Sequence, residues 1–295
     1  MISFDRDTER TGGGIAQVKA FYDSDGWKWV DGMSGDARRW GTSSGGPIQQ
    51  ELHRQHTDLL RRSLGLDGRC RDSKPVSIIE FGGGGQPAIS LLDGVDSYTG
   101  VDISSEGLRA AAVSIEPLSV TARFIEADVR SLPLEDGKFD IGYCAHMLYH
   151  LPHVDDQRRA LQEMARVVRP GGVLAVVGAN PYPIAFPGRC IRRAIADTPG
   201  LGPLVQAMRP PPPLPYLPMS HAWRASVLAA FGPTTTHSYG VPTPSFCRRV
   251  DESRPVGRLV WRGIATLESR HPRLALRMGN FTLVVLHKAG GDKGC

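Results

Sequence analysis

The stretch VSIIEFGGGGQ, residues 76–86, decides the fold of this chain. An apolar strand reaches Glu80, and four glycines follow, Gly82 to Gly85. Glycine permits positive φ and lets the backbone approach a ligand closely. Residues 86–92 are expected to begin a helix, with Pro87 well placed near its start. The alternative is an ordinary glycine-rich turn, but strand, glycine turn and helix N-terminus together predict a cradle for a nucleotide-type cofactor.

The segments downstream repeat the strand-and-helix alternation. SYTGVDIS ends a second strand on Asp102, 22 residues after Glu80, where an acid can accept ribose hydroxyls. ARFIEADVRSLPLEDGKFD places Asp128 after a third strand, where it could receive an adenine amino group. The glycines fit the dinucleotide fingerprint only loosely, from Gly83 to Ala88, so that fingerprint alone does not decide the cofactor.

Two more strands follow, with expected helices at 104–114 and 156–168 between the strands. FDIGYCAHMLYHL is a fourth strand that runs into His146 and His150. RVVRPGGVLAVVGA indicates a helix end, a Pro-Gly-Gly turn and a fifth strand. This alternation predicts a parallel sheet with right-handed crossovers.

The series resembles the class I, Rossmann-like methyltransferases that use S-adenosyl-L-methionine (SAM), of the small-molecule type. Glu80-x-Gly82-x-Gly84 matches the first family motif. The later motifs are matched in order by Asp102, Asp128, Phe139-Asp140 and Arg169-Pro170-Gly171-Gly172. The resemblance covers residues 75–180 strongly, and one departure is Gln86, where a further glycine is common.

The resemblance implies SAM as cofactor. Glu80 and the glycine loop would hold the methionine end, Asp102 the ribose, and Asp128 with Val129 the adenine. The full set of expected cofactor-binding residues is Tyr22, Glu80, Gly82, Gly83, Gly84, Asp102, Ile103, Asp128, Val129 and Ala145.

The resemblance also implies the fold class. We expect an α/β, doubly wound, mostly parallel seven-stranded sheet whose last strand, 281–288, is antiparallel. Residues 1–74 would form an N-terminal helical cap that includes an amphipathic helix at 48–65, and residues 75–180 the SAM-binding core. Residues 181–295 would add substrate-lid insertions and the closing strands of the same core, the first at 234–241.

Proline marks the expected lid after strand 5. NPYPIAFPG and RPPPPLPYLP lie within residues 179–220, and such density excludes a long regular helix or an inner strand. Ser220 can cap a helix over 221–231. We therefore expect an excursion over the carboxyl ends of strands 4 and 5, where open α/β sheets bind ligands, and a second excursion at 242–279. A purely structural flap is the alternative.

Composition agrees with a globular enzyme. The chain has 295 residues, of which 41% are hydrophobic and 22% charged. No apolar run reaches the roughly 18 residues that a membrane span needs, and the polar, acidic start MISFDRDTER is not expected to be a signal peptide. The five cysteines stand far apart without a CxxC pair, so a reducing cytoplasm is the simple expectation.

Charge is divided unevenly along the chain. Residues 1–180 hold 20 Lys and Arg against 25 Asp and Glu, whereas residues 181–295 hold 15 against 5. A basic half suits an acidic small substrate, or it is simply a solvated surface. The basic residues form scattered pairs without interleaved aromatics, which does not favour nucleic acid. The sequence assigns no oligomeric state.

Two histidines are the candidate catalytic residues. Methyl transfer from a sulfonium needs mainly alignment, and it needs a base only if the acceptor still carries its proton. His146 is the first candidate for base or acceptor-orienting group, and His150, four residues later, is the second. The alternative is that both line or pack the pocket. No carboxylate is near them in sequence, so no metal site is expected.

Aromatic residues are the candidate acceptor walls. Trp27, Trp29, Tyr149 and Tyr182 are the expected substrate-binding residues, and aromatic faces such as that of Tyr22 also attract a cationic sulfonium. The function that follows is methylation of a small-molecule acceptor, aromatic, amphipathic or acidic, on oxygen, nitrogen or carbon, in bacterial specialised metabolism. The alternatives are an RNA- or protein-modifying methyltransferase and a SAM-binding enzyme that does not methylate, such as a cyclase or decarboxylase.

Overall fold

A computed structural model describes residues 14–24, 46–68, 74–183, 214–242 and 244–290, with the isolated residues Ile195 and Thr198. Trp27, Trp29 and the run Pro210–Pro213 lie outside the described residues.

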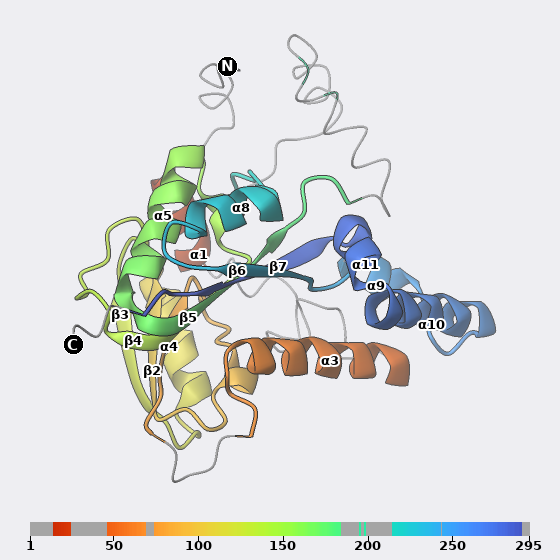
Figure 1. Cartoon of the computed structure of the whole chain (residues 1–295), viewed down its shortest axis with the longest axis horizontal. Coiled ribbons are helices and arrows are strands. Elements are labelled where there is room, and N and C mark those ends of the chain that lie inside the picture. Colours follow the sequence, from red (N-terminus) through yellow and green to blue (C-terminus); the bar gives the residue numbers. More distant parts are fainter. Residues whose placement is uncertain are drawn as a thin grey trace.

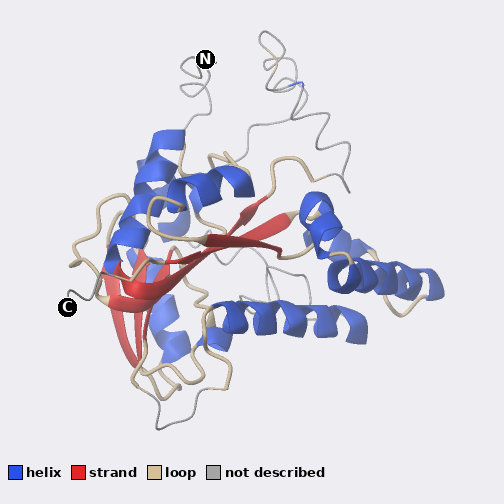
Figure 2. Cartoon of the chain, viewed as in Figure 1, coloured by secondary structure: helices blue, strands red, loops and turns tan. Residues whose placement is uncertain are grey.

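One seven-stranded sheet forms the centre of the molecule (Figure 2). Its strands are β1 (Ser77–Phe81), β2 (Ser97–Asp102), β3 (Thr121–Glu126), β4 (Phe139–Ala145), β5 (Val168–Ala179), β6 (Thr234–Ser238) and β7 (Phe281–His287). They are arranged in the order β3-β2-β1-β4-β5-β7-β6. The pairs from β3 across to β5 are parallel, and β7 is antiparallel to both β5 and β6. The expected fold class and its antiparallel last strand are confirmed.

Helices cover both faces of the sheet. The α-helices are α1 (Ile15–Asp23), α3 (Pro47–Ser63), α4 (Ser105–Ile115), α5 (Val154–Val167), α8 (His221–Leu228), α9 (Pro244–Arg249), α10 (Pro255–Arg270) and α11 (Pro272–Met278). In Figure 1, α5 and α8 lie on one side of the sheet and α3 and α4 on the other. No helix within the described ranges is long and apolar enough to cross a membrane.

Alternation along the strands builds a core on each face. Ile79, Val176 and Val284 belong to the cluster under α5 and α8, whereas Ile78 and Val177 belong to the cluster on the α3 side. The central strands β1, β4, β5 and β7 are almost wholly buried, as expected for strands covered on both faces. Edge strand β3 is largely exposed.

The expected helix at residues 86–92 is wrong. Only one 3₁₀ turn, η1 (Ile89–Leu91), follows the glycines. Pro87 has no N–H to donate, and the N–H of Ala88 donates instead to the carboxylate of Glu80, 3.0 Å away. Gly94, at φ 78°, then turns the chain toward β2. The glycine stretch therefore leads into a loop that is held against β1.

The Pro-Gly-Gly segment also differs from expectation. It lies inside β5, where the pairing with β4 shifts register between Phe139 and Ile141. Gly171, at φ 73°, donates its N–H to Lys288 O, and Gly172 O accepts from Lys288 N. Because Lys288, the residue after β7, supplies both partners, the expected turn becomes an irregularity within β5.

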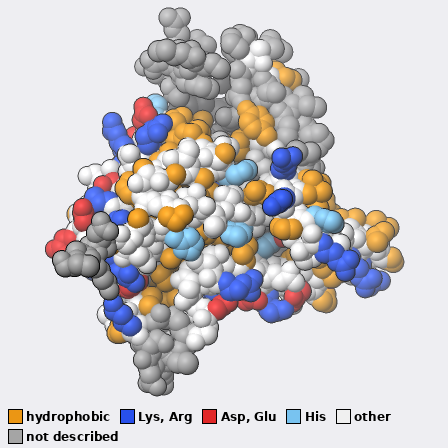
Figure 3. All heavy atoms as spheres, in the orientation of Figure 1, with side chains coloured by type: hydrophobic (Ala, Val, Ile, Leu, Met, Phe, Trp, Pro, Cys, Tyr) orange, Lys and Arg blue, Asp and Glu red, His pale blue; other side chains and the backbone are white. Residues whose placement is uncertain are grey.

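The second expected excursion is helical. Helices α9, α10 and α11 occupy residues 244–278 between β6 and β7, and α10 packs against α3. Val256 and Leu259 of α10 are exposed. Figure 3 shows hydrophobic and basic side chains at the right of the molecule, where Figure 1 places α10. The inner side buries Trp261 against Leu52 of α3.

A buried arginine stands between α8 and the sheet. Arg224 is 2% exposed, and its guanidinium packs on Gly178 and donates to the hydroxyl of Thr282. Its Nε and Nη1 have no hydrogen-bond partner among the described residues. Loss of water lowers the pKa of Arg224 to about 10, with a small opposing effect from the nearby Cys144. The cation is therefore retained at neutral pH although it lacks full compensation.

Replacing Arg224 is not expected to lower the free energy of unfolding. Arg224→Met keeps an unbranched apolar stem and removes a poorly paired buried cation, so the free energy of unfolding should stay unchanged or rise by about 1–4 kcal/mol. Urea unfolding monitored by circular dichroism measures it, with the exposed Arg258→Met as control. A loss of more than about 1 kcal/mol confined to Arg224→Met would show that the guanidinium has a further anionic partner.

Candidate active site

The glycine loop lies across the carboxyl ends of β1 and β2. Gly82, at φ 71°, donates its N–H to Val101 O at 2.8 Å. Gly84, at φ 55°, donates its N–H to Asp102 Oδ2 at 2.8 Å. A Cβ on Gly82 would also collide with the side chain of Met147, which follows β4. Both positions therefore require glycine for its conformation, and Gly82 requires it for space as well.

Glu80 holds this loop from beneath. It is 2% exposed, and its Oε2 accepts from Ala88 N and from the Tyr98 hydroxyl, both at 3.0 Å. A Cβ on Gly83 would lie 2.9 Å from the Glu80 carboxyl carbon. Glu80 thus acts on the loop from within the protein, and its expected contact with the methionine end of the cofactor stays a prediction.

Asp102 joins the loop to the next helix. Its Oδ2 accepts from Gly84 N, and its Oδ1 accepts from Ser104 N at 2.9 Å. Ser104 in turn caps α4, because its hydroxyl accepts from Gly107 N at 3.0 Å. Burial raises the pKa of Asp102, and the N–H donors of Ser104 and Gly84 oppose this effect. The carboxylate is the central link of the cradle.

The helix N-terminus at the cradle is that of α4. A Cβ on Gly107, in the first turn of α4, would lie 3.1 Å from the Cα of Gly84. The helix start and the glycine loop are therefore in close contact. The expected combination of glycine turn and helix N-terminus exists, but the helix follows β2 and not β1.

Asp128 lies after β3 in an ion pair. Its carboxylate accepts from Arg130 Nη2 at 2.6 Å and from Arg130 Nε at 3.0 Å. Arg130 also donates to Asp156 Oδ1 at 2.9 Å. Burial acts to raise the pKa of Asp128, but the hydrogen bonds from Arg130 outweigh it, so the pKa is lowered. Val129 is buried beside it, and adenine binding by this pair stays a prediction.

Helix α1 closes over the ends of β2 and β3. Lys19 donates to Ile103 O and to Glu126 Oε1, both at 2.8 Å. These contacts place Tyr22, on the next turn of α1, near Asp102 and 6.1 Å from the ring of His150, measured between centroids. Burial, and then the charge of Asp102, raise the pKa of Tyr22 to about 12. Its hydroxyl is therefore a hydrogen-bond donor at neutral pH.

His146 has an unusual backbone. Among the described residues, His146 is the only one other than glycine that has a positive φ, at 60°. Its N–H donates to Val177 O at 3.1 Å, and its half-buried ring meets that of Phe281 edge-on at 4.6 Å. Such conformations cost free energy and concentrate at functional sites. Ala145, the residue before it, ends β4 and is buried.

His150 has one defined tautomer. Its Nδ1 lies 3.0 Å from Pro215 O, and a carbonyl can only accept, so Nδ1 carries the proton. Burial lowers the pKa of His150, and the Pro215 contact only partly opposes this. The ring is neutral at pH 7, and Nε2 then holds the lone pair.

Aromatic rings gather beside the two histidines. Tyr149 lies 4.6 Å from His150, 5.1 Å from Tyr216 and 6.4 Å from His146, between ring centroids. Tyr182, just after β5, is 48% exposed, and its N–H donates to Asn180 Oδ1. The structure thus brings Tyr22, Tyr149 and both histidines together and leaves Tyr182 toward solvent. Trp27 and Trp29 remain predictions outside the described residues.

Sequence reasoning missed Tyr216 and Phe281. Phe281 begins β7, and an antiparallel strand starts at the edge where its parallel neighbour ends. That rule could have placed Phe281 near His146 once the last strand was expected to be antiparallel. Tyr216 has no comparable signal, because the route of the chain between β5 and α8 decides its position. Among the described residues, no three His, Cys, Asp or Glu side chains group as metal ligands.

Comparisons with known proteins agree with this geometry. Residues 79–176 match the family model of the methyltransferase domain. An O-methyltransferase of Pyrenophora dematioidea is 34% identical over 120 residues, covering 39% of this chain and 44% of the relative. The 27-O-demethylrifamycin SV methyltransferase of Amycolatopsis mediterranei is 35% identical over 131 residues, covering 43% and 45%. The chain thus spans about half the length of the curated relatives it matches.

Solved structures extend the likeness of the fold to most of the chain. The [4+2]-cyclase SpnF has a TM-score of 0.59 at 20% identity, covering 95% of this chain and 98% of its own. Together, the sheet order, the glycine loop and the family match define a class I, Rossmann-like methyltransferase domain. Residues 79–176 therefore belong to a methyltransferase domain, and the cofactor that this kind of domain indicates is SAM.

Removing the Asp102 carboxylate should weaken cofactor binding. Asp102→Ala loses the acceptor for Gly84 N and the expected acceptor for ribose. The binding free energy of SAM should therefore weaken by roughly 1–3 kcal/mol, which raises the Kd about 5- to 150-fold. Isothermal titration calorimetry on the folded variant measures it. Asp96→Ala is the control, because Asp96 accepts from Val76 N at the opposite end of the strands. Unchanged affinity in folded Asp102→Ala would exclude Asp102 from the cofactor site.

Proposed function

We propose that the whole protein transfers the methyl group of SAM to a small-molecule acceptor on oxygen, nitrogen or carbon. The observation that carries this proposal is the position of Tyr22 and His150. Tyr22 lies near Asp102 of the cofactor cradle and against His150 beyond the end of β4. The cradle is therefore continuous with a group of rings and a neutral histidine.

SAM supplies an activated methyl group for in-line displacement, so the chain must mainly bind and align the acceptor. The rings of Tyr149 and Tyr22 both lie beside His150, at 4.6 and 6.1 Å between centroids, and supply apolar surface there. Tyr22 stays protonated because its pKa is raised to about 12, so it can donate a hydrogen bond but cannot act as a base near neutral pH. These rings would also exclude water from the reacting atoms.

His150 is the better-supported base of the two histidines. The contact of Nδ1 with Pro215 O fixes the ring, and the lowered pKa keeps Nε2 unprotonated at pH 7. A general base needs such a positioned lone pair near the operating pH. His146 was the first candidate from sequence, but its backbone conformation and its contact with Phe281 support an orienting role.

The acceptor is aromatic or amphipathic. The rings of Tyr22, Tyr149, Tyr216 and Phe281 beyond the end of β4, called the ring group below, support this class. The relative from Pyrenophora dematioidea is an O-methyltransferase by name. We place the protein in bacterial specialised metabolism, for which the relative that acts on demethylrifamycin SV is the supporting comparison. A reducing cytoplasm fits the five cysteines, which stand far apart in the sequence without a CxxC pair.

A label-transfer experiment tests the function. The protein is incubated with SAM carrying a labelled methyl group, and separately with pools of hydroxylated aromatics, aromatic amines, total RNA and unfolded protein. Label should appear in one of the two small-molecule pools, with S-adenosylhomocysteine as coproduct. Label in RNA or protein alone would make this a macromolecule-modifying enzyme. Conversion of a substrate without label transfer would indicate a non-methylating enzyme, the class named for the fold neighbour SpnF.

Two substitutions separate the roles of the histidines. With a protonated acceptor, His150→Gln keeps size and loses basicity, so kcat should fall about 10²–10⁴-fold. His146→Asn tolerates positive φ and keeps hydrogen bonding, so its kcat should change much less. Steady-state kinetics with the acceptor found above measures both.

The pH profile gives an independent check. The neutral form of His150 is active and burial lowers its pKa, so the wild-type rate should persist below pH 6.5, the ordinary value, and fall only at more acid pH. A large loss in His146→Asn with full rate in His150→Gln would reverse the assignment. Full rate in both would leave alignment alone as the source of catalysis.

A further inference from the structure

The ring of His150 is held by a segment from a later part of the chain. His150 ends the 3₁₀ turn η2 (Leu148–His150), and its hydrogen-bond partner, Pro215 O, belongs to residues 214–220, the segment before α8. This segment is neither helix nor strand, yet Pro215 and Pro218 within it are buried. Which ring nitrogen of His150 carries the proton therefore depends on what keeps residues 214–220 against η2.

Two contacts join the segment to η2 on the side of the ring group. Leu217 N donates to Tyr149 O at 2.7 Å. The rings of Tyr216 and Tyr149 lie 5.1 Å apart between centroids. Tyr216 is 42% exposed, so this ring pair borders solvent. The opposite side of the same joint is buried against α5, and there a polar side chain completes it.

That side chain is Gln157, at the start of α5. It is 1% exposed, and its Nε2 lies 2.7 Å from Leu217 O and 3.3 Å from Leu151 O. Both oxygens are main-chain carbonyls that can only accept, so the atom between them is the amide nitrogen and not the amide oxygen. The two N–H groups of one amide thus reach the segment before α8 and the residue that follows η2.

These two hydrogen bonds flank the one that holds His150. Leu151 follows His150 directly, and Leu217 lies two residues after Pro215. The N–H groups of a planar amide point in fixed directions, so their two acceptors are kept in one arrangement. Without the amide, two buried carbonyl oxygens would lose this donor, which is costly enough to move the segments apart toward water.

We propose that Gln157 is a positioning residue that sets the Nδ1–H tautomer of His150. It acts through the main chain of residues 214–220 and of η2, because its own side chain is directed at carbonyl groups. The proposal rests on the proposed function only for the use of the lone pair on Nε2, which a general base must keep at one defined atom. The tautomer itself is a property of the protein without acceptor.

The tautomer can be observed directly. Long-range proton–nitrogen NMR spectra of the full chain, labelled on histidine, distinguish a protonated ring nitrogen from one that carries a lone pair. The signals of His150 are assigned by their absence in His150→Gln. Near neutral pH, the wild-type ring should be almost entirely in the Nδ1–H form. A predominant Nε2–H form, or a mixture of both forms, in the wild-type protein would overturn the proposal without any further variant.

Matched substitutions assign the tautomer to one residue. Gln157→Met keeps the length of the side chain and removes both donors, so the Nδ1–H form of His150 should become the minor one. Amide hydrogen exchange at Leu217 should become about tenfold faster in the same variant, the effect of losing one buried hydrogen bond. Gln162→Met changes an exposed glutamine of the same helix and should alter neither measurement.

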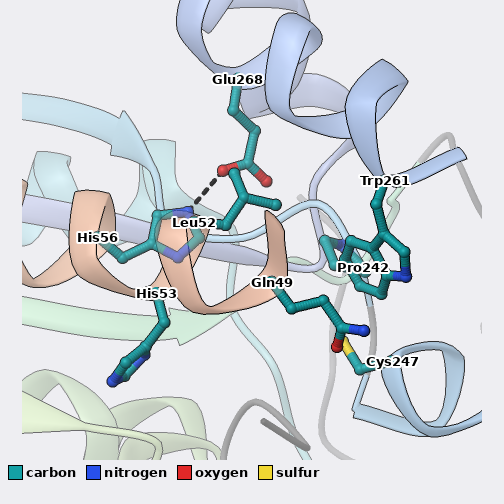
Figure 4. Close-up of a pocket in the computed structure, with 8 residues that line it drawn as sticks. All are labelled: Gln49, Leu52, His53, His56, Pro242, Cys247, Trp261 and Glu268. Atoms are coloured by element: carbon teal, nitrogen blue, oxygen red, sulfur yellow. Dashed lines mark hydrogen bonds and ion pairs between the residues drawn. The ribbon is translucent and has the colours of Figure 1, made fainter. Parts of the chain in front are cut away.

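A second control removes a glutamine that is also buried. Gln49 of α3 is 5% exposed and lines a small pocket between α3 and α10, as Figure 4 shows. Helix α3 covers the opposite face of the sheet from α5, so Gln49→Met reports on the loss of a buried amide alone and should keep the wild-type tautomer. An unchanged tautomer in Gln157→Met, or an equal loss in all three variants, overturns the proposal.

Kinetics separates this proposal from the proposed function. With an acceptor found by label transfer, kcat of Gln157→Met should fall by the same factor as the Nδ1–H fraction, whereas the Kd for SAM should stay unchanged. A lost tautomer with full kcat would support the positioning role and reject His150 as the base. A lower kcat with the wild-type tautomer would reject the positioning role and retain the function. Without any methyl transfer, the function is rejected and the NMR result still decides the role of Gln157.

Discussion

The carboxylate of Asp102 is the interaction on which the cofactor cradle depends. It accepts from the glycine loop through Gly84 N and from the start of α4 through Ser104 N. The loop that follows β1 and the helix that follows β2 are thereby held together at the end of β2. Without that acceptor, the N–H of Gly84 would lose the partner that fixes its direction. Burial raises the pKa of this carboxyl, and the amide donors act in the opposite sense by favouring its charged form.

The ring group beyond β4 depends on a second constraint, the direction of β7. Because β7 is antiparallel to β5, its first residue, Phe281, lies beside the last residue of β5, Ala179. This brings an aromatic ring to His146 from the far end of the chain. The main-chain carbonyl of Pro215, from the segment before α8, then orients His150. The candidate catalytic side chains are thus positioned by segments that return to the sheet after the cofactor-binding strands.

Buried polar groups in the described part of the chain differ in how many of their hydrogen-bonding atoms have a partner. The Glu80 carboxylate holds two donors and serves the loop. The guanidinium of Arg224 and the amide oxygen of Gln49 are buried with fewer partners than they can use. Arg224 packs on strand β5, so its cost falls on stability, whereas Gln49 borders a small pocket between α3 and α10.

Local pattern was sufficient for the strands, for helices α3, α4, α5 and α8, for the Ser220 cap and for the positions of Glu80 and Asp102. Strand periodicity and the conformational freedom of glycine are properties of neighbouring residues, so they can be interpreted along the chain.

The expected helix after the glycines was wrong because Glu80, eight residues earlier, accepts the hydrogen bond from the N–H of Ala88. The roles of His146 and His150 were open from sequence, since a tautomer and a positive φ are set by Pro215 and by the end of β4. The pocket of Gln49, His56 and Glu268 had no local signal at all, because it forms only when α3 and α10 pack together. The sequence by itself determined the class of the sheet, mostly parallel with an antiparallel last strand, and the motifs whose resemblance implied the cofactor. The tertiary structure alone decided the order of the strands and which distant side chains gather beyond the end of β4, because contacts between remote segments carry no local signal.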